Sequence, residues 1–199
     1  SMFNSFKLKI PEVVIMNRET AFEELSVRLE DKNLIKHSLA VEAIMRKLAV
    51  NLQEDIELWG LAGLLHDIDR KKVGEDKHRY GLVGAEILEG LNVNPTIIYA
   101  VKSHNPNLGI QRRRRIDKAL FCAIPLARLL TACAASHPEK KLSALKLQYV
   151  KDRFNDESFE RETVDREKIS TCEEIGLSLD AFIETGLSAM QEISDKLGL

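Results

Sequence analysis

Apolar residues recur every three or four positions along most of the chain, which is the period of an amphipathic helix. After Asn17, a suitable N-cap, the residues Phe22, Leu25 and Leu29 fall on one helical face. The next segment repeats the pattern and turns His37 toward its own apolar face. Because no strand-rich region or internal repeat interrupts this period, the predicted fold class is all-α.

Further helices are predicted wherever the period resumes between turn residues. They cover about residues 54–68, 80–91, 95–104, 115–136, 140–153, 166–175 and 178–197. The helix at 54–68 is apolar on most of its faces, so it is predicted to be the buried centre. A charged loop is predicted at 70–77, directly after that helix.

The 199 residues are expected to form a single compact domain. The predicted domain covers residues 17–199, and residues 1–16 form an N-terminal arm whose segment 13–16 is either a short strand or an apolar extension. The last helix carries an apolar stripe from Leu179 to Leu197 that needs a partner surface. Together, the arm and the stripe allow a homodimer as an alternative to burial within one chain.

Charge and composition exclude several classes of protein. Lys and Arg total 29 and Asp and Glu total 31, so the net charge of −2 predicts no general attraction to polyanions. No run of 18 apolar residues is present, and the N-terminus lacks the apolar core of a signal peptide. The expected location is cytoplasmic, with no membrane partner.

Four polar side chains stand out because their surroundings are apolar. His66 and Asp67 are adjacent at the end of the most apolar helix, while His37 and His104 lie in other largely apolar helical segments. Burying an imidazole or a carboxylate is costly unless a partner compensates. A divalent cation is the usual partner, since neutral imidazole and carboxylate are both good metal ligands.

These residues and their neighbouring blocks resemble the HD-domain proteins, all-helical metal-dependent phosphohydrolases with an H…HD…D ligand pattern. The resemblance rests on the segments Leu58–Asp69, Gly81–Leu88, Asp117–Phe121 and Cys172–Leu179, and it extends from about Asn17 to Leu199. It implies an HD-type helical bundle. It also implies a divalent metal (Mn, Fe, Zn or Mg) held by His37, His66 and Asp67.

Two positions depart from the family pattern within the expected site. Ile124 stands where the resemblance places the closing aspartate ligand, and Tyr80 stands where a histidine is common. Asp117 could replace that aspartate only across two helical turns, roughly 11 Å, which is too far for the same ion. The resemblance therefore leaves three ligands, and the metal would be absent if Ile124 prevents its binding.

Two functional hypotheses from different classes follow. The first is a metal-dependent phosphohydrolase acting on a phosphorylated small molecule or nucleotide, in which Asp67 is ligand and proton acceptor, and Lys71 and His104 neutralise phosphate charge. The second is a metal-free HD module that binds a phosphorylated ligand or a protein partner. The intact part of the motif favours the first hypothesis, and Ile124 favours the second.

A run of four arginines, Arg112, Arg113, Arg114 and Arg115, is the strongest charge feature. Such a run is commonly a solvated helix face. Here it lies between His104 and the segment with Ile124, so it is also predicted to border the site and to bind substrate phosphate through its guanidinium groups. Nucleic acid is not the expected ligand, because no aromatic residues interleave the run to stack on bases.

Overall fold

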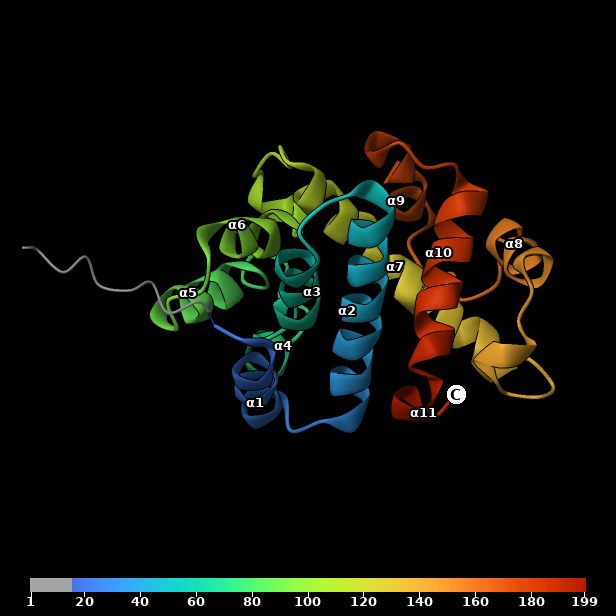
Figure 1. The fold of residues 1–199 in the computed structure, drawn as a ribbon, viewed down its shortest axis with the longest axis horizontal. Helices are drawn as coiled ribbons and strands as arrows, with labels where there is room; N and C mark the ends of the chain where they lie inside the picture. Colours follow the sequence, from blue (N-terminus) through green and yellow to red (C-terminus); the bar gives the residue numbers. More distant parts are fainter. Residues whose placement is uncertain (1–15) are drawn as a thin grey trace, which may run out of the picture.

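The computed structural model describes residues 16–199, and all the regular structure in this range is helical (Figure 1), which confirms the all-α prediction. The main helices are α1 (Arg18–Leu29), α2 (Lys32–Leu52), α3 (Ile56–Leu65), α4 (Arg70–Val73), α5 (Leu82–Gly90), α6 (Pro95–Ser103), α7 (Arg115–Ser136), α8 (Leu147–Asn155), α9 (Arg166–Ser170), α10 (Leu179–Glu192) and α11 (Ser194–Leu197). Short 3-10 turns lie at Pro106–Leu108, Leu142–Ala144 and Thr171–Ile175. The predicted arm at 1–16 falls almost wholly outside the described residues, so it stays a prediction.

Side-chain caps explain where the first three helices begin. The Asn17 Oδ1 atom accepts a hydrogen bond from the Thr20 amide at 2.9 Å, as predicted for an N-cap. Asp31 and Asp55 cap α2 and α3 in the same way. Each cap satisfies a backbone amide that has no partner inside its helix.

Three predicted boundaries were wrong. The charged loop at 70–77 contains the short helix α4, whose turn is held by amides that donate to the Asp69 carbonyl and by the buried Val73. The helix predicted at 140–153 begins only at Leu147, because Leu142 and Leu145 enter the core from a 3-10 turn and an extended residue. The last predicted helix breaks at Ile193, between α10 and α11.

Helix α3 is the buried centre of the domain, as predicted, and every residue from Trp59 to Leu65 is buried. It packs closely against α2 (Figure 1), and Gly63 makes this approach possible. A Cβ atom at Gly63 would lie 2.8 Å from the Val41 carbonyl oxygen, which no side chain tolerates without movement. This close packing brings the end of α3 beside the N-terminal part of α2, where His37 lies.

Helix α7 contacts α2, α3, α6, α9 and α10, and it forms the second wall of the core. By length and composition alone it could cross a membrane, but 72% of its most apolar window is buried inside the domain. Core helices of globular domains commonly pass the same test, so this helix is weak evidence for a membrane span.

The apolar stripe on α10 packs inside the domain. Phe182, Ile183 and Met190 are buried, and α10 contacts both α2 and α7. The stripe therefore has its partner surface within the same chain. It therefore no longer supports the homodimer hypothesis. The other argument for a homodimer, the arm at 1–16, falls almost wholly outside the described residues.

A candidate metal centre beside an anion pocket

His37, His66 and Asp67 converge where α3 ends against α2. Each offers one ligand atom, and these three atoms lie within 4.8 Å of one another. The ring centroids of His37 and His66 are 5.3 Å apart, and the His66 Nε2 atom is 3.9 Å from an Asp67 carboxylate oxygen. These three residues therefore lie close enough together to hold one metal ion, as expected from the sequence.

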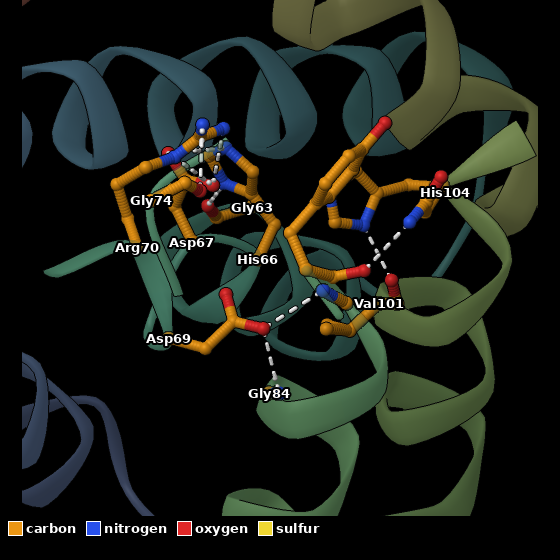
Figure 2. A network of polar contacts seen from close by, with 12 residues as sticks. Gly63, His66, Asp67, Asp69, Arg70, Gly74, Gly84, Val101 and His104 are labelled. Atoms are coloured by element: carbon orange, nitrogen blue, oxygen red, sulfur yellow. Dashed lines mark hydrogen bonds and ion pairs between the residues drawn. The ribbon is translucent and has the colours of Figure 1, made fainter. Parts of the chain in front are cut away.

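The hydrogen bonding of His66 leaves one ring nitrogen free for a ligand. Its Nδ1 atom lies 2.7 Å from the Gly63 carbonyl oxygen (Figure 2), so Nδ1 carries the proton and Nε2 presents a lone pair. Among residues 16–199, neither this Nε2 atom nor the buried Nε2 atom of His37 has a hydrogen-bond partner. Buried nitrogens without partners are costly, and a bound ion would satisfy both.

The third ligand, Asp67, is only 2% exposed and is paired with Arg70. The Arg70 guanidinium donates to both carboxylate oxygens at 3.2–3.3 Å (Figure 2), and a second contact to the Gly74 carbonyl holds it in place. Burial acts to raise the pKa of the Asp67 carboxyl, but the charged Arg70 guanidinium opposes burial, and this pKa lies well below its usual range. The carboxylate is therefore ionised and available to a cation.

His104 lies next to this cluster, with its ring centroid 5.7 Å from that of His66. It is buried, and its Nδ1 atom donates to the Val101 carbonyl (Figure 2). Burial, with a smaller contribution from His66, lowers the pKa of His104 to about 3, so the ring is neutral at pH 7. The ring centroid of Tyr80 is 5.6 Å from that of His104. The position at which the family commonly has a histidine therefore lies at the site.

Asp69, two residues after the His-Asp pair, organises the opposite wall. One of its carboxylate oxygens accepts hydrogen bonds from the amides of Gly81 and Gly84, each at 2.8 Å. Figure 2 shows the contact to Gly84. Gly81 has φ +79°, and a Cβ atom there would lie 3.0 Å from the Val101 carbonyl oxygen. The start of α5 is thereby anchored beside His104.

Two cavities meet at the site. The smaller one has a volume of about 70 Å³ and is lined by Asp67, Arg70, Tyr80, His104, Phe121, Ile124, Pro125, Arg128, Asp165 and Lys168. The larger is an open groove of about 700 Å³. Both cavities share Asp67, Arg70 and Arg128, so these three residues form the junction between them.

Arg128 is the site residue that the sequence analysis missed most clearly. Among residues 16–199 its guanidinium forms no hydrogen bond or ion pair of its own, although it lines both cavities. Burial lowers the pKa of this guanidinium below its ordinary value, yet arginine remains charged at neutral pH. The available signal was its spacing, because Arg128 follows Ile124 by four residues on one face of α7.

Most of the positive charges expected at the site lie elsewhere. Lys71 has a side chain that is 51% exposed, pairs with Glu30 and lines neither cavity. None of the four arginines of the run lines either cavity. Arg112 stacks on Phe121, with its guanidinium carbon 3.7 Å from the ring centroid. Arg113 is exposed, Arg114 donates to Thr96, and Arg115 pairs with Glu54.

The expectation that the whole arginine run borders the site therefore does not match its placement. Asp117 is likewise no ligand, because its Oδ2 atom accepts from the amides of Arg113 and Arg114 and so caps α7. Cation charge at the site comes instead from Arg70, Arg128 and Lys168.

The residues present fit a metal ion with three protein ligands. Two orphaned imidazole nitrogens and an ionised carboxylate are close together, and open positions face the cavities. Ile124 is 7% exposed and lines the same cavity as Asp67, so hydrocarbon occupies the wall from which the family's fourth ligand is expected. The donor set can hold an ion, with one carboxylate fewer than the family pattern.

Comparisons with known proteins agree with this site. Residues 34–138, just over half of the chain, match the HD domain family. Similar proteins include ribonuclease Y of Staphylococcus epidermidis, 36% identical over 74 residues, which are 37% of this chain and 14% of that protein. Ribonuclease Y of Clostridium perfringens is 27% identical over 122 residues, 59% of this chain and 24% of that protein.

This chain therefore spans no more than about a quarter of the length of these relatives. No solved structure matches it. The family match covers the helices that supply His37, His66, Asp67 and Ile124, and it agrees with the helical fold and the ligand cluster. The chain belongs to the HD-domain family, a superfamily of metal-dependent phosphohydrolases.

Proposed function

We propose that this protein hydrolyses a phosphate ester of a small molecule or nucleotide, using one divalent ion held by His37, His66 and Asp67. The observation that carries the proposal is the pair of orphaned histidine nitrogens beside an ionised carboxylate, within 4.8 Å. A bound divalent ion would supply Lewis-acid activation of a water molecule and of a phosphoryl oxygen.

The chain's own residues bind and orient the phosphate. Arg70, Arg128 and Lys168 line the smaller cavity, and cationic side chains there neutralise phosphate charge in a site with little water. We assign this role to them in place of Lys71, which lies outside the cavity. His104 is neutral at pH 7, so it accepts a hydrogen bond from water and does not neutralise charge.

The similar proteins support the reaction class. Their name, ribonuclease Y, describes cleavage of RNA, whose nucleotides are joined by phosphate esters. Similarity to these proteins therefore suggests cleavage of a phosphate ester, whereas the low identity and short coverage leave the substrate to this chain's own cavities.

The test is metal content together with turnover. The purified protein is expected to retain Mn, Fe or Zn after dialysis and to hydrolyse p-nitrophenyl phosphate, measured by elemental analysis and by absorbance. Asp67→Asn and His66→Ala should abolish both properties. His78→Ala is the matched control, because His78 is exposed in the α4–α5 connection. Turnover that survives Asp67→Asn and chelation would contradict the proposal.

One observation favours the second candidate, a metal-free module that binds a phosphorylated ligand. Arg70 already pairs with Asp67, and Ile124 contributes no charge, so the site is electrostatically compensated without an ion. For this candidate, the same measurements should give no retained metal and no turnover, while inorganic phosphate still binds in an Arg128-dependent manner.

A further inference from the structure

We propose that the ligand is a phosphate monoester with a bulky, uncharged organic group. Its single phosphate binds in the smaller cavity, and its organic group occupies the larger groove lined by α2, α7 and residues 160–163. The inference rests on the proposed function for the identity of the phosphate, and it adds the chemical class of the rest of the ligand. Four features of the two cavities support it.

The first feature is the difference in size. The smaller cavity, about 70 Å³, has room for a few water molecules or one phosphate group. The groove, about 700 Å³, lies within the range of sites that take drug-sized ligands, roughly 300–1,000 Å³. Since the two cavities meet at Asp67, Arg70 and Arg128, one ligand can occupy both, with its ester oxygen at the junction.

The second feature is the state of the two arginines at this junction. Arg70 is engaged with Asp67, whereas Arg128 has no hydrogen-bonding or ion-pair partner among residues 16–199. Arg128 is half-buried and lines both cavities, and a phosphate there can accept two parallel hydrogen bonds from its guanidinium. Arg128 therefore anchors the phosphate at the point where the organic group leaves the smaller cavity.

The third feature is the uncharged part of the groove lining. Apolar carbon is contributed by Leu34, Ala132, Ala135 and Leu197. Hydrogen-bonding groups are contributed by Asn33, Thr131 and Thr163. Apolar surface beside uncharged hydrogen-bonding groups can bind the uncharged part of an organic ligand, such as a nucleoside.

The fourth feature is the charge of the groove lining. Three carboxylates line the groove besides Asp67, those of Glu75, Glu160 and Glu162, and Lys36 is the one lysine among its lining residues. Additional phosphates on the ligand would share the groove with these carboxylates, and like charges repel. The groove is therefore suited to a ligand with one phosphate and disfavours polyphosphates and oligonucleotides.

The experiment measures binding, so its result is independent of turnover. The probes are inorganic phosphate and non-hydrolysable phosphonate analogues of adenosine monophosphate and adenosine triphosphate, titrated by calorimetry into the purified protein. We expect the monophosphate analogue to bind at least about tenfold more tightly than either inorganic phosphate or the triphosphate analogue.

Two sets of variants test the position of the organic group. Ala135 is exposed and lines the groove, so Ala135→Trp fills the groove without disturbing the core and should weaken the monophosphate analogue about tenfold. Inorganic phosphate should bind Ala135→Trp as before. The matched control is Ser143→Trp, at an exposed position outside both cavities.

The charge argument has its own pair of variants. Replacing Glu75, Glu160 and Glu162 together by Gln should bring binding of the triphosphate analogue close to that of the monophosphate. Glu157→Gln, at an exposed position outside the groove, should leave the preference unchanged. Unaltered binding of the monophosphate analogue to Ala135→Trp, or a wild-type preference for the triphosphate or for a short oligonucleotide, would overturn the inference. Lack of metal and turnover with the expected binding pattern would instead overturn only the hydrolase proposal.

Discussion

Ile124 puts a branched hydrocarbon into a cavity otherwise rich in polar side chains, beside Asp67 and His104. It follows Asp117 by two helical turns and precedes Arg128 by one, so a single face of α7 carries all three. The loss of one carboxylate and the presence of an unpaired arginine on this face shift the site toward anions. At the residue scale, Ile124 is the position on this face that departs from the family pattern.

Ile124→Asp is expected to strengthen metal binding. A carboxylate there adds a fourth ligand to His37, His66 and Asp67, and even indirect changes at metal sites alter affinity by about 10- to 100-fold. Titration calorimetry with Mn²⁺ and Zn²⁺ on wild type and variant measures the change, and Ile124→Val is the matched control. Equal affinities would show that position 124 does not reach the ion.

Arg70→Gln is expected to make the protein depend on metal for stability. Removing the guanidinium leaves the Asp67 carboxylate buried without its partner, which costs about 3–5 kcal/mol where a buried pair is broken. A divalent ion would then compensate for the lost charge. Thermal unfolding with chelator and with Mn²⁺ should show a larger metal-induced rise in Tm for the variant than for wild type. The opposite order would indicate that Arg70 does not compete for this carboxylate.

At the scale of elements, the site depends on a contact between the turn after α3 and the start of α5. Asp69 satisfies two amides at the beginning of α5, and Gly81 and Gly84 have no side chain to obstruct this approach. Burial raises the pKa of the Asp69 carboxyl, and its second oxygen has no partner among residues 16–199. The contact fixes α5 and, through it, the position of Tyr80 against His104.

Asp69→Ala is therefore expected to destabilise the domain by about 1–3 kcal/mol, the cost of leaving buried donors unsatisfied. Asp69→Asn keeps one acceptor oxygen and should lose less. Urea unfolding measures the free energy for both variants. Asp76→Ala is the control, because that aspartate is exposed and caps only a local turn. A loss no larger than that of the control would mean that α5 is held by other contacts.

At the scale of the whole molecule, the site is a set of ionisable groups built into the core. Burial lowers the pKa of both His37 and His104 to about 3, and the pKa of His66 is lowered for the same reason. Because these three histidines have lower pKa values in the folded chain than in the unfolded chain, the stability of the metal-free domain should depend on pH. Ion pairs are also built around the core: the buried Glu42 pairs with Arg18 and Arg46, and Arg46 pairs with Glu57, so α1, α2 and α3 are linked.

The direction follows from proton binding by the two states. Below about pH 6.5 the unfolded chain protonates these histidines, whereas the folded chain does not until about pH 3, so stability falls as the pH is lowered. Each histidine contributes up to about 1.4 kcal/mol per pH unit in this window. Urea unfolding in chelator at pH 7.5, 6 and 5 measures the slope, which should be shallower in His104→Asn. A stability that rises below pH 6.5 would contradict the assignment of neutral buried rings.

The sequence by itself determined that the fold is helical, that α3 is the buried central helix, and that α1 begins after Asn17. These features depend on the local spacing of apolar residues and on the chemistry of a helix cap. It also brought out His37, His66, Asp67 and His104, since polar residues in apolar helices are conspicuous without any contact information. Boundaries failed where the core overrode local preference, as at Leu142 and Leu145, which are buried outside any α-helix.

Only the tertiary structure decided which charges belong to the site. Four adjacent arginines attract notice in a sequence, but successive residues at a helix start point in different directions, and none of the four lines either cavity. Arg70 reaches Asp67 within one turn of the chain, whereas Arg128 comes to the same cavities from α7, which packs against α3. The arrival of Arg128 is a property of packing between distant segments, which no local pattern of residues encodes.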